Sequence, residues 1–83
     1  MPPLDSLQSI SLRLLRAGER GTIARTHALR DATARTLKTM GLVPGQTITL
    51  VQRFPRFVVK IGSRCHCLDD SAINAIYIRT LRP

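Results

Sequence analysis

Between residues 28 and 40 the apolar positions repeat with the period of an α-helix. At about 100° per residue, Leu29, Leu37 and Met40 fall within one arc of about 140°. The same arc also contains small or weakly polar side chains, namely Ala32, Thr33 and Thr36. Gly41 is placed to end the helix in the left-handed conformation, and Pro44 prevents the helix from resuming. The pattern therefore predicts one substantial helix over residues 28–40.

The remaining chain shows short β-rich runs separated by turn residues. Apolar and β-branched positions predict strands over residues 22–26, 47–52, 57–61, 64–68 and 75–79. Gly18 and Gly21 mark a turn before the first strand, and Gly62 with Ser63 marks a tight turn before the fourth. The segment "LDDSA" predicts a brief helical turn capped by Asp69 or Asp70.

This order of elements predicts a mainly β fold, a small SH3-like five-stranded barrel with one inserted α-helix and short helical turns. The chain has 83 residues, which is enough for a single domain over residues 1–83 and no more. We expect residues 1–11 to form an N-terminal tail or a short helix. No apolar stretch approaches the length of a membrane span, and the first residues do not resemble a signal peptide. We therefore expect a soluble protein.

The charge balance indicates an acidic partner. Lys and Arg total 13 against 5 Asp and Glu, giving a formal net charge of +8. Nucleic acid, an anionic membrane surface or an acidic protein face would each be attracted by such a chain. Nucleic-acid binding stays open as an alternative function on this charge. Against it, Phe54, Phe57 and Tyr77 are the only aromatic residues, which leaves little for stacking bases.

Cys65, His66 and Cys67 form the only local cluster of residues that commonly bind metals. On a strand, the two cysteines point to one face and the histidine to the other, so the three cannot chelate one ion. The other histidine, His27, lies far earlier in the chain. We therefore expect no metal site and two buried or half-buried thiols, reduced in a cytosol. A small metal-responsive module that uses Cys65 and Cys67 remains an alternative.

Catalytic machinery is not evident in the sequence. No nucleophile stands beside a base, no glycine-rich phosphate loop is present, and Asp69 with Asp70 is better explained as a helix cap. We predict that the protein is not an enzyme, and we assign it no catalytic residue and no cofactor.

Three blocks of the sequence resemble the FeoA family of bacterial ferrous iron transport. They lie within residues 12–80 and read "LRAGERGTIART", "LKTMGLVPGQTITLVQR" and "VVKIGSRCHCLDDSAINAIYI". The most specific piece is Met40, Gly41, Leu42, Pro44 and Gly45 before a β-rich run. Further support comes from the late positions of Ala72, Ile73 and Ile76.

The resemblance implies a non-catalytic accessory protein of ferrous iron transport. Such a protein would be cytoplasmic or at the inner face of the membrane. Its partner would be the FeoB-type membrane iron permease, which carries a cytosolic GTPase domain, and it would act by protein–protein interaction. Contact with the membrane surface is compatible with the positive charge.

The central hairpin departs from the family pattern. Members commonly carry a longer loop where this chain has only Phe54, Pro55 and Arg56. Arg53 and Arg56 are thereby concentrated beside Phe54 at an exposed tip. Arginine and aromatic side chains are enriched where protein surfaces bind one another, so we predict Arg53, Phe54 and Arg56 as partner-binding residues.

Overall fold

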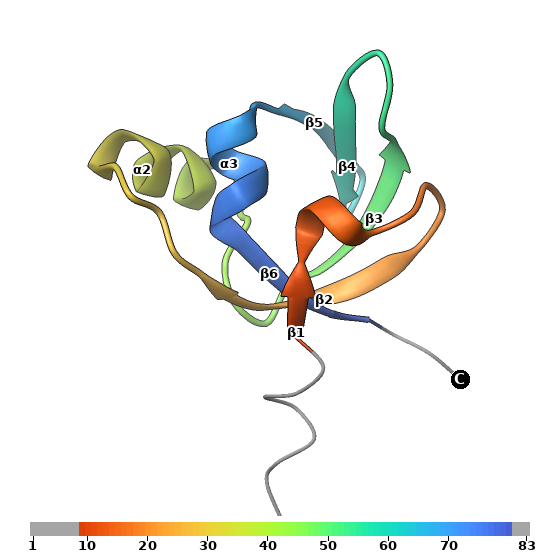
Figure 1. Ribbon diagram of the computed structural model, residues 1–83, viewed down its shortest axis with the longest axis horizontal. Helices are drawn as coiled ribbons and strands as arrows, with labels where there is room; N and C mark the ends of the chain where they lie inside the picture. Colours follow the sequence, from red (N-terminus) through yellow and green to blue (C-terminus); the bar gives the residue numbers. More distant parts are fainter. Residues whose placement is uncertain (1–8, 81–83) are drawn as a thin grey trace, which may run out of the picture.

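The computed structural model describes residues 9–80, which form one antiparallel sheet with short helices (Figure 1). Most of the expected N-terminal tail or short helix, residues 1–8, lies outside the described residues. Along the chain the elements are β1 (Ser9–Ser11), the 3₁₀ helix η1 (Leu12–Leu14), β2 (Arg20–Thr26), α2 (Asp31–Met40), β3 (Thr47–Gln52), β4 (Phe57–Ile61), β5 (Arg64–Leu68), α3 (Asp70–Ala75) and β6 (Ile76–Thr80).

The sheet has six strands in the order β1-β6-β2-β3-β4-β5, so β1 and β5 form its edges. The mainly β class is as predicted, and β3, β4 and β5 have the predicted bounds. The sheet has one strand more than the five expected. The additional strand is β1, which pairs with β6 through Ser9↔Arg79 and Ile10↔Ile78. A strand of three residues has little pattern of its own, and its pairing with a distant strand is what defines it.

Gly18 and Gly21, which were both predicted to mark a turn, have different positions in the structure. Gly18, with a φ of 91°, lies in the turn before β2. Gly21 lies inside β2, where a Cβ atom would approach the carbonyl oxygen of Arg79 and the Cδ1 of Ile78 to 3.1 Å. Gly21 therefore allows close packing of β2 on β6 rather than forming the turn.

The helix α2 begins later than predicted. The backbone N–H of His27 donates to the carbonyl of Ala75 at 2.7 Å, which continues the sheet beyond β2. The backbone of Arg30 is still extended, so the helix begins only at Asp31. Leu29 thus lies outside the helix and is 90% exposed, which corrects its assignment to the apolar face.

The end of α2 is as predicted. Gly41 adopts a φ of 79°, and its N–H donates to the carbonyls of Leu37 and Lys38. Leu42 then donates its own N–H to the carbonyl of Leu37 and is fully buried. This left-handed cap turns the chain back toward the sheet and anchors it in the core.

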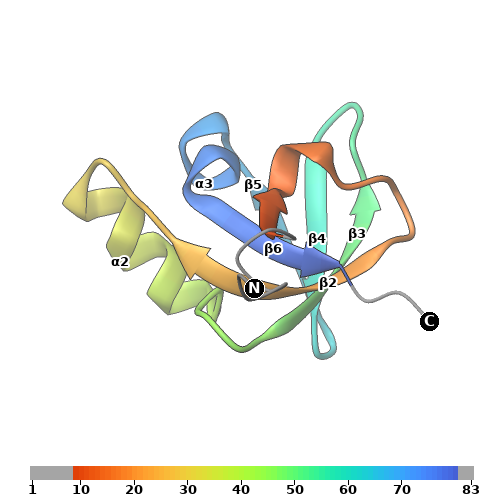
Figure 2. The same ribbon diagram turned by 60° about the horizontal axis from the view of Figure 1, so that its bottom comes forward.

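The core lies between the concave face of the sheet and the layer formed by η1 and α3 (Figures 1 and 2). α2 lies to one side, beyond α3, and buries only Leu37 of its own side chains. The buried apolar residues are Leu12, Leu15, Ile23, Leu37, Leu42, Ile48, Leu50, Phe57, Val59, Leu68, Ala72, Ile73, Ala75, Ile76 and Ile78. Each fully buried Leu or Ile stabilises the fold by roughly 1.5–3 kcal/mol relative to exposure.

Candidate docking site at the central hairpin

The loop between β3 and β4, residues 53–56, carries the predicted partner-binding residues. The peptide bond between Phe54 and Pro55 is cis, and Gln52 Nε2 donates to the carbonyl of Arg56 at 3.2 Å across the loop. Phe54 lies in this short loop, and its side chain is 82% exposed. The clipped hairpin thus presents an isolated aromatic ring to solvent.

Arg53 has a different role from its neighbours in the loop. Its Nη1 donates to the backbone carbonyls of Arg13, at 2.8 Å, and Leu15. The same guanidinium lies over the ring of Phe57 at 5.7 Å from the centroid. Arg53 therefore fastens the hairpin to the end of η1. Its positive charge remains at the site because both acceptors are neutral.

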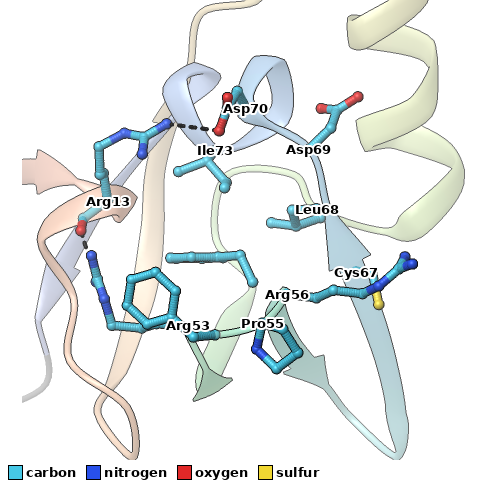
Figure 3. Close-up of a pocket in the computed structure, with 11 residues that line it drawn as sticks. Arg13, Arg53, Pro55, Arg56, Cys67, Leu68, Asp69, Asp70 and Ile73 are labelled. Atoms are coloured by element: carbon cyan, nitrogen blue, oxygen red, sulfur yellow. Dashed lines mark hydrogen bonds and ion pairs between the residues drawn. The ribbon is translucent and has the colours of Figure 1, made fainter.

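An open depression of about 600 Å³ lies between the hairpin, η1 and the start of α3 (Figure 3). Its apolar floor includes Phe57, Leu68 and Ile73, which are at most 9% exposed. The other lining residues are Arg13, Arg53, Phe54, Pro55, Arg56, Cys67, Asp69 and Asp70. A depression with an apolar floor and a charged rim suits an apolar side chain that carries polar neighbours.

The charges at the rim are not balanced. Asp69 caps α3, because its Oδ1 accepts from the N–H of Ala72 at 2.8 Å. Asp70 Oδ1 lies 3.3 Å from Arg13 Nη2, the one salt bridge formed within residues 9–80. The side chain of Arg56 is exposed and makes no hydrogen bond or ion pair with the part of the chain that the structure describes. The depression consequently offers a free cation beside an apolar surface.

The sequence predicted the residues of the hairpin but not the residues of η1 and α3 that line the other side of the depression. Arg13, Asp70 and Ile73 lie on η1 and α3, and only the tertiary fold brings them beside the loop. No local pattern in the sequence signals such a meeting. The capping role of Asp69, in contrast, was predictable from the residue types at the start of a helix.

The two cysteines lie on the predicted strand but are more exposed than expected. Cys65 and Cys67 are free and exposed on β5, which corrects the prediction of buried or half-buried thiols. The residues opposite them on β4 are Lys60 and Val58, while His66 lies opposite the fully buried Val59. β5 is also an edge strand, so one of its sides is not paired with another strand of the described sheet.

His66 points away from the thiols, toward the core side of the sheet. It is half-buried, and its Nε2 has no hydrogen-bond partner in the described structure. Within residues 9–80, no three His, Cys, Asp or Glu residues gather in a group that could hold a metal ion.

None of the helices in residues 9–80 has the length and apolar character of a membrane span.

A family model and a sequence relative identify the same family. The family model for the FeoA domain matches residues 10–80. The Fe(2+) transport protein A of Leptolyngbya boryana is 35% identical over 78 residues, which cover 93% of this chain and 95% of that protein.

Solved structures with the same fold include a free-standing domain and a larger regulator. The FeoA of Stenotrophomonas maltophilia, an SH3 domain protein solved in complex with zinc, superposes with a TM-score of 0.73. It is 23% identical, and the match covers 83% of this chain and 88% of that one. A manganese-dependent transcriptional repressor gives a TM-score of 0.81 at 25% identity, with the match covering 98% of this chain and 44% of the repressor.

The family model spans most of the chain, the Leptolyngbya relative matches nearly end to end, and the SH3-like fold is the one predicted. The chain therefore belongs to the FeoA family of non-catalytic accessory proteins of ferrous iron transport.

Proposed function

We propose that this protein binds the cytosolic part of a FeoB-type membrane iron permease through the β3–β4 hairpin and the adjoining depression. The observation that carries the proposal is the exposed ring of Phe54 beside an apolar floor and the unpaired Arg56. Aromatic and arginine side chains next to a pocket are the usual energetic centres of protein interfaces. The partner surface would supply an apolar side chain for the floor and a carboxylate for Arg56.

The net charge of +8 supports the same choice of partner surface. Long-range attraction to an acidic face accelerates encounter, and the apolar contacts then hold the complex. In this proposal the protein acts in the cytoplasm and lies at the inner face of the membrane when it is bound to the permease.

Nucleic-acid binding is less well supported by the site. Phe57 forms the floor and is buried, and the ring of Tyr77 is covered by the guanidinium of Arg25 at 4.4 Å. Phe54 alone remains free to stack on a base, and one ring does not make a platform for successive bases.

The test is to measure binding of the purified protein to a detergent-solubilised FeoB-type permease from the same cells. Phe54→Ala and Arg56→Ala should each weaken binding by about tenfold or more if they are central contacts. Leu29→Ala is a matched control for Phe54, because Leu29 is 90% exposed and lies before α2, outside the depression. Arg35→Ala is the corresponding control for Arg56, because Arg35 is an exposed arginine on α2.

Equal weakening by the hairpin variants and their controls would contradict the proposed site. Retention of nucleic acid instead of the permease, removed by moderate salt, would favour the alternative function.

A further inference from the structure

Cys65 and Cys67 form a pair of exposed thiols on the outer face of the edge strand β5. Residues two apart on a strand point to the same face, and the buried Leu68 and half-buried His66 occupy the opposite one. Neither thiol contributes to the core, and the docking function proposed above does not require the pair. The two groups therefore call for a separate explanation.

The spacing suits shared binding of one ion better than a disulfide. Two residues of strand separate the Cα atoms by about 6.6 Å, close to the upper limit for a disulfide. Two sulfurs on one metal ion lie about 4–4.6 Å apart, because each metal–sulfur bond is about 2.3 Å. Side-chain rotation about the Cα–Cβ bonds brings the sulfurs that close without moving the backbone.

Among the described residues, only the two thiolates are available as ligands for a metal ion at this position. His66 points to the other face, and the cross-strand neighbours of the cysteines are Lys60 and Val58. Within residues 9–80 no third Cys, His, Asp or Glu joins the pair. Zn²⁺ in protein sites takes four ligands, and hard divalent ions prefer oxygen. A soft monovalent ion such as Cu⁺ prefers thiolates and is satisfied by two of them in a linear arrangement.

The local charge favours the same ion. Two thiolates around a monovalent cation carry a net charge of −1, whereas the corresponding divalent complex is neutral. Lys60 lies directly opposite Cys65 in the β4–β5 register, and Arg56 lines the same depression as Cys67. These two cations stabilise the anionic complex and gain nothing from the neutral one.

We propose that Cys65 and Cys67 bind one soft monovalent metal ion of the Cu⁺ type as a two-thiolate chelate on the outer face of β5. Each thiol loses its proton to solvent when the ion binds, and no electron transfer is involved. Because Cys67 also borders the docking depression, the bound ion lies at the edge of the proposed interface.

The test titrates the full-length, fully reduced protein anaerobically with Cu⁺ against a chromogenic Cu⁺ chelator. We expect one ion per monomer, and we expect Cys65→Ser and Cys67→Ser each to reduce affinity by about 100-fold or more, since a chelate loses its intramolecular advantage. Lys60→Glu should reduce affinity several-fold, whereas Lys60→Arg should not. His66→Gln serves as a control on the same strand and should leave affinity unchanged.

Other results would overturn the proposal. Wild-type affinity in either single serine variant would show that the thiols act separately. One ion per two chains, together with the mass of a dimer, would show bridging between molecules instead of chelation within one. Equal or tighter binding of Zn²⁺ or Fe²⁺ would exclude selection for a monovalent ion. Permease binding is measured separately in metal-free protein, so either proposal can fail while the other stands.

Discussion

Arg53 Nη1 donates to the backbone carbonyl of Arg13 at 2.8 Å, across 40 positions of the sequence. A second bond from the same nitrogen reaches the carbonyl of Leu15. Both carbonyls lie at or just after η1, where a short helix leaves its last acceptors without partners. One side chain thus provides hydrogen bonds at the end of η1 and holds the hairpin, one wall of the depression, against it.

Replacing Arg53 should therefore lower stability as well as binding. Arg53→Ala removes a charged donor from two carbonyls, and we expect the free energy of unfolding to fall by about 1–2 kcal/mol. Urea unfolding followed by circular dichroism measures this change. Arg56→Ala, in the same loop but without such bonds, should change stability by less than about 0.5 kcal/mol. Equal losses in the two variants would contradict the fastening role of Arg53.

Gly21 tests the close packing of β2 on β6. Gly21→Ala would place a Cβ atom 3.1 Å from both the Arg79 carbonyl oxygen and Ile78 Cδ1. The Arg79 carbonyl and the end of the Ile78 side chain must each give way by a few tenths of an ångström, and the carbonyl belongs to a paired strand. We therefore expect a loss of about 1–3 kcal/mol in a thermal or urea unfolding experiment. Thr22→Ala, at the next and half-buried position of the same strand, should cost less. A neutral Gly21→Ala variant would show that the two strands separate readily.

Asp69 and Asp70 are adjacent carboxylates with different effects on stability. Asp69→Ala removes the cap of α3 and should cost about 1 kcal/mol. Asp70→Ala removes the salt bridge to Arg13, between side chains that are 88% and 47% exposed, and a negative charge in the first turn of α3. Because both side chains are so exposed, this substitution should cost less than about 1 kcal/mol. Unfolding of both variants under the same conditions compares the two directly. The reverse order would mean that the salt bridge, not the cap, holds α3.

Salt should affect the two parts of the proposed docking differently. Raising the salt concentration should slow association of the wild-type protein with the permease, because its net charge of +8 attracts the partner over long range. The dissociation rate should change less, since Phe54 and the apolar floor hold the complex. Surface plasmon resonance at several salt concentrations separates the two rates. An association rate independent of salt would refute electrostatic attraction.

Local signals in the sequence were sufficient for most of the sheet. The runs at 47–52, 57–61 and 64–68 became strands with those bounds because turn residues delimit each one. Gly41 ended α2 as expected, since the left-handed position favours glycine there. The misassigned Leu29, by contrast, shows that a helical period continues in the sequence beyond the point where sheet pairing holds the backbone extended.

The candidate site was predicted only in part, for a similar reason. The exposure of Phe54 followed from the short loop, which is a local property. The structural use of Arg53, the wall formed by η1 and α3, and the exposed position of Cys65 and Cys67 depend on which elements become neighbours. Such pairings depend on the whole fold, and no residue type at a single position specifies them.

The lateral position of α2 has a consequence for local unfolding. Of its ten residues only Leu37 is buried, whereas β2 and β6 pair with each other in the middle of the sheet. Opening α2 exposes little apolar surface, so its free energy of opening lies well below that of global unfolding. Its amide hydrogens should exchange with solvent long before those of Ile23 and Ile78. The helix can thus detach and reform while the sheet, with the hairpin and the thiol pair on it, stays folded.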